Sequence, residues 1–220
     1  TTPVGNATSI NDCDLGDGTA NFDLNALAMV VNTNPAYTVN WFLYANATNP
    51  ILISPFNTST TFVYAVVSDG AGCESVPTQV DLNVIATPTA NTASAAACET
   101  ANGTAAFDLT ALENTVNGGS GNTVLWYSDA NATMTIASPF LTAATTIYAI
   151  VDNGSCLSNI VAVDLNVTTV PSISTASSTF CDEGSGMANF DLTILENTVN
   201  GGNGNTVSWY SDINGTNSIA

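Results

Sequence analysis

Cys13-Asp-Leu-Gly-Asp-Gly-Thr-Ala-Asn-Phe-Asp-Leu24 is the stretch that decides the organisation of this chain, because it occurs three times. It returns as Cys98-Glu-Thr-Ala-Asn-Gly-Thr-Ala-Ala-Phe-Asp-Leu109 and as Cys181-Asp-Glu-Gly-Ser-Gly-Met-Ala-Asn-Phe-Asp-Leu192, at nearly the same offset each time. Self-similarity at a nearly fixed period is the signature of repeat architectures. The sequence therefore predicts a tandem array.

Other landmarks keep the same spacing and divide the chain. A tryptophan follows the Phe of each copy at a constant distance, and a Pro follows the last alternating segment of each full repeat. Such short, Pro-containing joints favour a semi-rigid connection. We divide the chain into repeat 1 (residues 1–86), repeat 2 (residues 87–170) and an incomplete repeat 3 (residues 171–220). Because repeat 3 stops at the position matching Ala137, we expect the sequence to be a segment of a longer native chain.

Within a repeat, the apolar residues have the periodicity of strands. Val80-Asp-Leu-Asn-Val84 alternates apolar and polar residues, as in a half-buried strand, and residues 62–67 are typical of a central strand. Leu24, Leu27 and Val31 stand three and four residues apart, which predicts a short helical turn after the motif. About seven short strands in roughly 83 residues predict an all-β fold of tandem immunoglobulin-like β-sandwich domains.

Composition excludes several classes of function. The chain has 18 acidic residues and no Lys, Arg or His, which gives a net charge of −18. Binding to nucleic acids or to anionic membranes needs cationic side chains, so both are excluded. Apolar runs no longer than six residues are too short for insertion into a membrane. Without His or Lys the usual general bases and Schiff-base amines are missing, so we expect no enzyme activity and no cofactor.

The five cysteines favour one disulfide in each domain. The expected pairs are Cys13 with Cys73 and Cys98 with Cys156, whereas Cys181 has no partner within the chain. Each pair would close a loop of about 60 residues, which stabilises a domain by roughly 4 kcal/mol in the chain-entropy model. Disulfides persist in oxidising compartments, so we expect an extracellular or cell-surface protein.

Four acidic residues near the first cysteine are candidate metal ligands. Asp12, Asp14, Asp17 and Asp23 could supply oxygen ligands to calcium, although their spacing is not that of an EF-hand loop. The interpretation we favour is a solvated turn that Asp stabilises. An equivalent of Asp23 recurs in every repeat, on the outward side of the predicted strand and without a second carboxylate nearby. This pattern indicates a structural rather than a catalytic role.

The aromatic residues divide between the core and the opposite side of their strand. The alternation places Trp41, Trp126 and Trp209 in the core. The residue after each tryptophan points the other way, so three residues are candidates for contacts between chains: Phe42, Tyr127 and Tyr210. Packing within the second sheet is the alternative for these three.

The order of the motifs carries a family resemblance. Ala-Asn-Phe-Asp-Leu, Trp-Tyr-Ser-Asp, Ser-Pro-Phe, Thr-Thr-Ile-Tyr-Ala and Val-Asp-Leu-Asn-Val resemble the tandem immunoglobulin-like repeats of very large secreted surface proteins in Bacteroidota. The resemblance covers the whole chain. It implies export by the type IX route and a role in adhesins, stalks or surface filaments.

The sequence as a whole predicts a structural segment of a long extracellular fibre or adhesin stalk. Near-identical repeats suit a scaffold, and the low fraction of charged residues lets copies of the chain associate side by side. Two alternatives stay open: a ligand- or glycan-binding adhesin module, and an accessory domain of a secreted hydrolase. A surface glycan or protein target would be bound by regions outside these residues.

Overall fold

The computed structural model describes residues 2–100, 102–182 and 184–219. Repeat 1 contains a four-stranded sheet in the order β1-β6-β5-β3 and a two-stranded sheet of β2 and β4. A helix connects β2 to β3. The elements are β1 (Thr8–Cys13), β2 (Ala20–Phe22), α1 (Leu24–Val31), β3 (Thr38–Phe42), β4 (Phe56–Thr58), β5 (Thr61–Ser68) and β6 (Thr78–Ile85).

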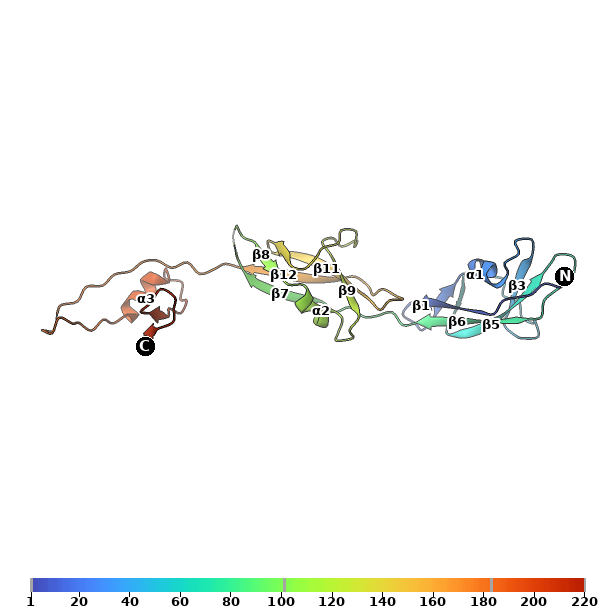
Figure 1. Ribbon diagram of the computed structural model, residues 1–220, viewed down its shortest axis with the longest axis horizontal. Coiled ribbons are helices and arrows are strands. Elements are labelled where there is room, and N and C mark those ends of the chain that lie inside the picture. Colours follow the sequence, from blue (N-terminus) through green and yellow to red (C-terminus); the bar gives the residue numbers. More distant parts are fainter. Residues whose placement is uncertain (1, 101, 183, 220) are drawn as a thin grey trace. The chain divides into compact units, whose positions relative to one another are not determined.

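The larger sheet mixes antiparallel and parallel pairs. β5 is antiparallel to both β3 and β6, whereas β1 runs parallel to β6. The strands β1 and β6 therefore end at the same level, and they lie side by side in Figure 1. The two sheets enclose one core, which makes repeat 1 an immunoglobulin-like β-sandwich and confirms the predicted fold class.

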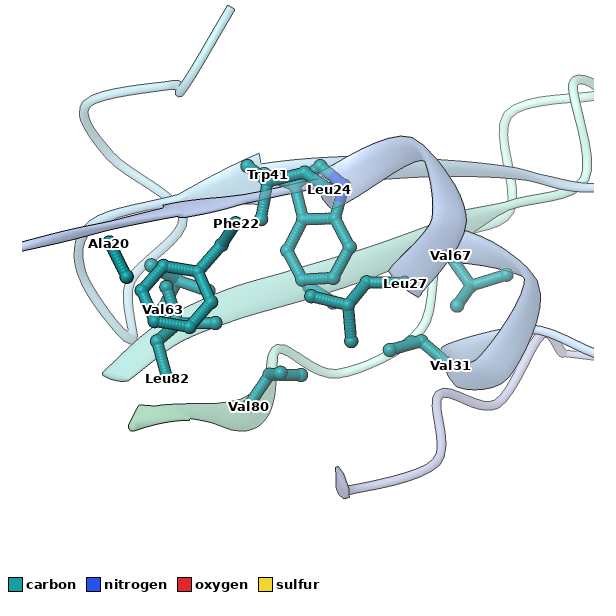
Figure 2. Packing of buried hydrophobic residues seen from close by; sticks show 11 residues of the cluster. Ala20, Phe22, Leu24, Leu27, Val31, Trp41, Val63, Val67, Val80 and Leu82 are labelled. Atoms are coloured by element: carbon teal, nitrogen blue, oxygen red, sulfur yellow. The ribbon is translucent and has the colours of Figure 1, made fainter. Parts of the chain in front are cut away.

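The core of repeat 1 follows the alternation of the sequence. Val80 and Leu82 of β6 are fully buried, while Asp81 between them is exposed. Residues from both sheets and from the helix meet in this core, as Figure 2 shows. Its buried members are Ala20, Phe22, Leu24, Leu27, Val31, Trp41, Val63, Ala65, Val67, Val80 and Leu82.

Helix α1 contributes three side chains to this core. Leu24, Leu27 and Val31 are buried, at the predicted spacings of three and four residues. The Asp23 carboxylate accepts hydrogen bonds from the backbone N–H groups of Asn25 and Ala26, at 2.9 and 3.2 Å. These bonds cap the start of the helix, where N–H groups have no partner within the helix. The predicted helical turn after the motif is confirmed.

Repeat 2 has the same arrangement, with a four-stranded sheet β7-β12-β11-β9 and a two-stranded sheet of β8 and β10. In the described part of the chain, no helix has the length and the apolar character needed to cross a bilayer. The elements of repeat 2 are β7 (Ala93–Cys98), β8 (Ala105–Phe107), α2 (Thr110–Val116), β9 (Thr123–Tyr127), β10 (Phe140–Thr142), β11 (Thr145–Asp152) and β12 (Val161–Thr168).

Repeat 3 contains α3 (Thr193–Val199) and the strand pair β13 (Trp209–Tyr210) and β14 (Ser218–Ile219). The chain divides into two compact units, one of residues 1–95 with 106–166 and one of residues 96–105 with 167–220.

One backbone hydrogen bond of 2.9 Å, to the last carbonyl of the helix, recurs in every repeat. It joins Asn6 to Val31, Asn91 to Val116 and Ser174 to Val199.

Candidate functional site at the bond between repeats 1 and 2

A disulfide joins repeat 1 to repeat 2. Cys13, the last residue of β1, is bonded to Cys156 in the loop between β11 and β12, with a Cα–Cα distance of 5.8 Å and a sequence separation of 143. The predicted pairs within each repeat, Cys13 with Cys73 and Cys98 with Cys156, are therefore wrong. Cys73, Cys98 and Cys181 are exposed free cysteines.

The two cysteines of repeat 1 cannot meet because they lie at opposite ends of β6. Cys13 pairs in register with Ile85, the last residue of that strand. Cys73 lies in the loop before the strand, which begins at Thr78. The eight residues of β6 span about 23 Å at about 3.3 Å per residue. The Cα atoms of a disulfide lie within about 7 Å of each other, so a bridge within the repeat would require the sheet to unfold.

Backbone atoms of both repeats surround the bond. The Sγ atom of Cys13 lies 3.6 Å from the carbonyl oxygen of Ser155 in repeat 2. The Sγ atom of Cys156 lies 3.8 Å from the carbonyl oxygen of Ile85 in repeat 1. A disulfide sulfur has no proton to donate, so both are packing contacts. Cys156 is 2% exposed, which shields its side of the bond from solvent reagents.

Asn153 connects the two repeats a second time. Its Nδ2 donates a hydrogen bond to the carbonyl oxygen of Ala86 in repeat 1, at 3.0 Å. Its Oδ1 accepts from the backbone N–H groups of Ser155 and Cys156, at 3.0 and 2.8 Å. One amide side chain therefore shapes the loop that carries Cys156 and also contacts the neighbouring repeat.

Ser158 closes the base of the same loop. Its Oγ accepts from the backbone N–H of Val151 at 2.9 Å and donates to the carbonyl oxygen of Asn159 at 2.8 Å. Its own N–H donates to the carbonyl oxygen of Val151 at 2.8 Å. These bonds fix the backbone on both sides of Cys156, so the loop presents its sulfur in a defined position.

The sequence predictions did not identify Asn153 and Ser158, although the sequence contains a signal for them. Asp69 and Ser75 flank Cys73 in repeat 1 much as Asn153 and Ser158 flank Cys156 in repeat 2. Polar residues that recur on both sides of a cysteine indicate a loop with a defined, hydrogen-bonded conformation rather than a variable one. The odd number of cysteines also fits bonds that run from one repeat to the next.

The calcium candidates serve separate parts of the backbone. Asp12 accepts from the N–H of the next residue, Asp14 accepts from two glycine N–H groups, and Asp23 caps α1. Asp17 accepts hydrogen bonds from the hydroxyl and the N–H of Thr19. Both bonds lower the pKa of the Asp17 carboxyl, and the bond from the hydroxyl has the larger effect. Among the described residues, no three His, Cys, Asp or Glu side chains come close enough together to hold a metal ion. The structure therefore does not assemble the proposed calcium site.

The recurring aspartate lies just before each helix, and in repeats 1 and 2 it follows the preceding strand rather than lying on it. Asp108 accepts from the N–H and hydroxyl of Thr110, at 3.0 and 2.6 Å, and from the hydroxyl of Ser138 at 3.0 Å. Asp191 makes the same two bonds to Thr193. The threonine hydroxyl is the first cause that lowers the pKa of each carboxyl below its usual value. These contacts give the aspartate a structural role.

The aromatic residues lie on both sides of their strands, as the alternation predicts. Trp41 and Trp126 are each 7% exposed and belong to the buried residues, whereas Trp209 is only half-buried and does not take the predicted core position. Phe42 and Tyr127 are half-buried, and Tyr210 is 46% exposed. The predicted contacts of these three residues with other chains stay a prediction.

Repeat 1 also has a groove of about 450 Å³ beside the edge strand β3. The amides of Asn25 and Asn40 line it together with the apolar pair Leu52 and Ile53. These two apolar residues are 88% and 66% exposed, and repeat 2 has the single residue Ala137 in their place. The exposed apolar pair Leu52 and Ile53 at the edge of the groove is therefore particular to repeat 1.

Comparison with known proteins identifies a family through its model. The model of the Flavobacterium inter-domain disulphide bond domain matches this chain twice, over residues 9–88 and 94–171. No curated protein matches the chain.

Several solved structures with tandem domains are similar at low identity. An I-band fragment of titin has 11% identity, with 76% of this chain and 64% of that chain covered and a TM-score of 0.28. The extracellular domains 3–5 of Drosophila OTK have 14% identity, 74% and 60% coverage and a TM-score of 0.29. The fibronectin(III)-like modules of Clostridium thermocellum CbhA have 19% identity, 60% and 77% coverage and a TM-score of 0.28. This chain spans less than two thirds of the titin and OTK structures, and at such TM-scores these likenesses support no conclusion about function.

Proposed function

We propose that the repeats of this chain form a tension-bearing segment of an extracellular stalk or fibre. The chain belongs to the family of the Flavobacterium inter-domain disulphide bond domain, and the proposal starts from that membership. The bond between Cys13 and Cys156 carries this proposal, because it fastens consecutive repeats to each other. The Asn153 amide reinforces the same junction. A covalent tie between neighbouring domains suits a structure that must not come apart under load.

The bond also changes which residues can extend when the chain is pulled. Along the backbone, the path from Cys13 to Cys181 runs through most of repeats 1 and 2. Through the disulfide, the same path contains only the short segment from Cys156 to Cys181. Unfolding of the residues between Cys13 and Cys156 therefore adds no length to a chain under load. A stalk built in this way keeps its length even when a domain loses its fold.

The chemistry of the chain supports an extracellular location. Disulfides persist in oxidising compartments, and a chain without Lys or Arg offers no site to trypsin-like proteases. With 8% charged residues, long-range repulsion between copies is weak at physiological salt. We propose export to the cell surface by the type IX route and lateral association with copies of the same chain, with Phe42, Tyr127 and Tyr210 as contact residues.

The absence of Lys and Arg from the sequence provides a sharp test. Thr89 is exposed in the segment between the repeats, and Thr89→Arg creates a single trypsin site within residues 1–220. Trypsin added to intact cells that make this variant should cut after position 89. The parts of the chain before and after this cut should stay together on a non-reducing gel and separate after reduction.

Two further variants complete this test. Thr89→Arg combined with Cys156→Ser should release the fragments without reductant, and Thr89→Gln should not be cut. Fragments of the single variant that separate without reductant would refute the covalent junction. Cleavage that occurs after lysis but never on intact cells would refute display at the surface.

The groove of repeat 1 supports a second candidate function, the binding of a neutral glycan. Amide groups beside exposed aliphatic side chains suit the hydroxyls and the apolar faces of a sugar, and the volume of about 450 Å³ lies in the range of ligand pockets. Binding on a glycan array that is lost in Leu52→Ser would support it. Met134→Ser, which removes an exposed apolar residue from repeat 2, is the matched control. No binding by the parent chain would refute it.

A further inference from the structure

The outer side of β5 carries two aromatic rings that do not belong to the core. Phe62 and Tyr64 stand two residues apart on this strand, so their side chains lie on the same face of the sheet. The buried Val63 between them points to the opposite face, into the core. Phe62 is 48% exposed and Tyr64 is half-buried. Both rings therefore lie on the solvent side of the sandwich.

The two rings form a corner. The centroids of Phe62 and Tyr64 lie 5.9 Å apart and the ring planes stand at 83° to each other, which is an edge-to-face arrangement. Beside the contact, the face of one ring is therefore at a right angle to the face of the other. The faces of aromatic rings carry partial negative charge and attract cations that lie within about 6 Å of the ring centre. A cation placed in this corner contacts both rings at once.

A carboxylate lies next to the corner. Asp81 of β6 is the register partner of Phe62, and such directly opposite residues place their side chains on the same face, with Cβ atoms about 5 Å apart. Gln79, the register partner of Tyr64, donates a hydrogen bond from Nε2 to Oδ1 of Asp81 at 2.8 Å. The described residues provide no hydrogen-bond donor to the Oδ2 atom of Asp81. One carboxylate oxygen beside two ring faces is therefore left for a cation.

Repeat 2 lacks this arrangement at the equivalent positions. Thr146 takes the place of Phe62, and its hydroxyl donates to Oδ1 of Asp164 at 2.8 Å. Ala162 takes the place of Gln79. The same sandwich therefore folds without a phenylalanine at this position, so the requirements of the fold do not explain the exposed ring in repeat 1.

We propose that the corner of Phe62, Tyr64 and Asp81 binds an arginine side chain of another protein. A guanidinium group is planar, stacks on an aromatic face and donates to a carboxylate at the same time, whereas a lysine ammonium is a compact point charge. Charge complementarity selects such a partner, because the chain has a net charge of −18. A copy of residues 1–220 cannot supply the cation, since they contain no Lys, Arg or His. The corner therefore serves a basic partner rather than contacts between copies of this segment.

Nuclear magnetic resonance titration of the whole chain at physiological salt tests the inference. The probe is a short peptide of glycine and serine with blocked ends and one central arginine. The control probe carries citrulline, which replaces the guanidinium by an uncharged group of nearly the same shape. The arginine peptide should shift the backbone signals of Phe62, Tyr64 and Asp81 more than those of the equivalent residues in repeat 2. The citrulline peptide should shift neither set, and equal shifts with both peptides would overturn the inference.

Three variants identify the contacts. Phe62→Thr introduces the residue that repeat 2 has at this position and should raise the dissociation constant about two- to fivefold, because one ring face is lost. Asp81→Asn should raise it by a similar factor. Asp164→Asn removes the same charge from an exposed site in repeat 2 and should leave the dissociation constant unchanged. An equal loss in the two aspartate variants would reduce the binding to attraction by net charge and overturn the inference, as would an unchanged dissociation constant in Phe62→Thr.

The site should also transfer to repeat 2. Thr146→Phe combined with Ala162→Gln places a ring two residues from Tyr148 and an amide two residues from Asp164, as in repeat 1. On titration with the arginine peptide, this double variant should show larger shifts in repeat 2 than the parent chain. A double variant with well-dispersed amide signals and no such increase would overturn the assignment of the corner. The tension-bearing role does not depend on these outcomes, because it rests on the disulfide between repeats 1 and 2.

Discussion

Stretching a single molecule from its two ends gives the most direct measure of the junction between repeats 1 and 2. The bond from Cys13 to Cys156 spans a sequence separation of 143, and this part of the chain is removed from the path that force can extend. At about 3.5 Å per residue, Cys156→Ser should therefore lengthen the fully extended chain by about 500 Å. Reduction of the parent chain should give the same increase.

The experiment is done with optical tweezers and handles joined enzymatically to the two termini, so that the free cysteines play no part. Cys73→Ser is the matched control, since Cys73 is exposed and unbonded. It should leave the extended length of the oxidised chain unchanged.

Disulfides within each repeat would give a different result. The pairs Cys13–Cys73 and Cys98–Cys156 would each shield a loop of about 60 residues, so reduction would add about 410 Å. Cys73→Ser would then lengthen the oxidised chain by about 210 Å. Either of these two lengths would refute the assignment of the junction.

Three further perturbations test the fold and the loop at the junction. Leu82→Ala leaves a cavity at a fully buried site and should lower the free energy of unfolding of repeat 1 by about 2–5 kcal/mol, as measured by chemical denaturation. Leu165→Ala is the corresponding variant for comparison in repeat 2. A loss of unfolding free energy below about 1 kcal/mol would contradict the core assignment. Asn153→Asp keeps the acceptor within the loop but removes the donor to Ala86, so dithiothreitol should reduce the disulfide faster than in the parent, and an unchanged rate would show that this hydrogen bond does not hold the junction closed. The thermal midpoint should be flat from about pH 5 to 8 because the chain has no His, and should fall below about pH 4. Hydrogen bonds lower the folded-state pKa of Asp108, so its stabilising contribution is present above the unfolded pKa near 3.8 and disappears as pH falls through the folded pKa; a midpoint that rises on acidification would contradict this.

Local patterns of the sequence were sufficient to predict the sandwich and its helix. Period-two alternation places Val80 and Leu82 in the core and Asp81 outside, because successive side chains of a strand point to opposite faces. The spacing of Leu24, Leu27 and Val31 predicts the helix for a similar reason, since such positions share one face. These inferences need no knowledge of which strands are neighbours.

The partner of each cysteine depended on tertiary structure. The spacing of Cys13 and Cys73 along the sequence fits a disulfide equally well whether the two lie at the same end of a domain or at opposite ends. The parallel pairing of β1 with β6 sets Cys13 beside Ile85, far from the loop that carries Cys73. Sequence spacing measures distance along the chain, whereas a disulfide requires proximity in space, and the order and direction of the strands determine that proximity.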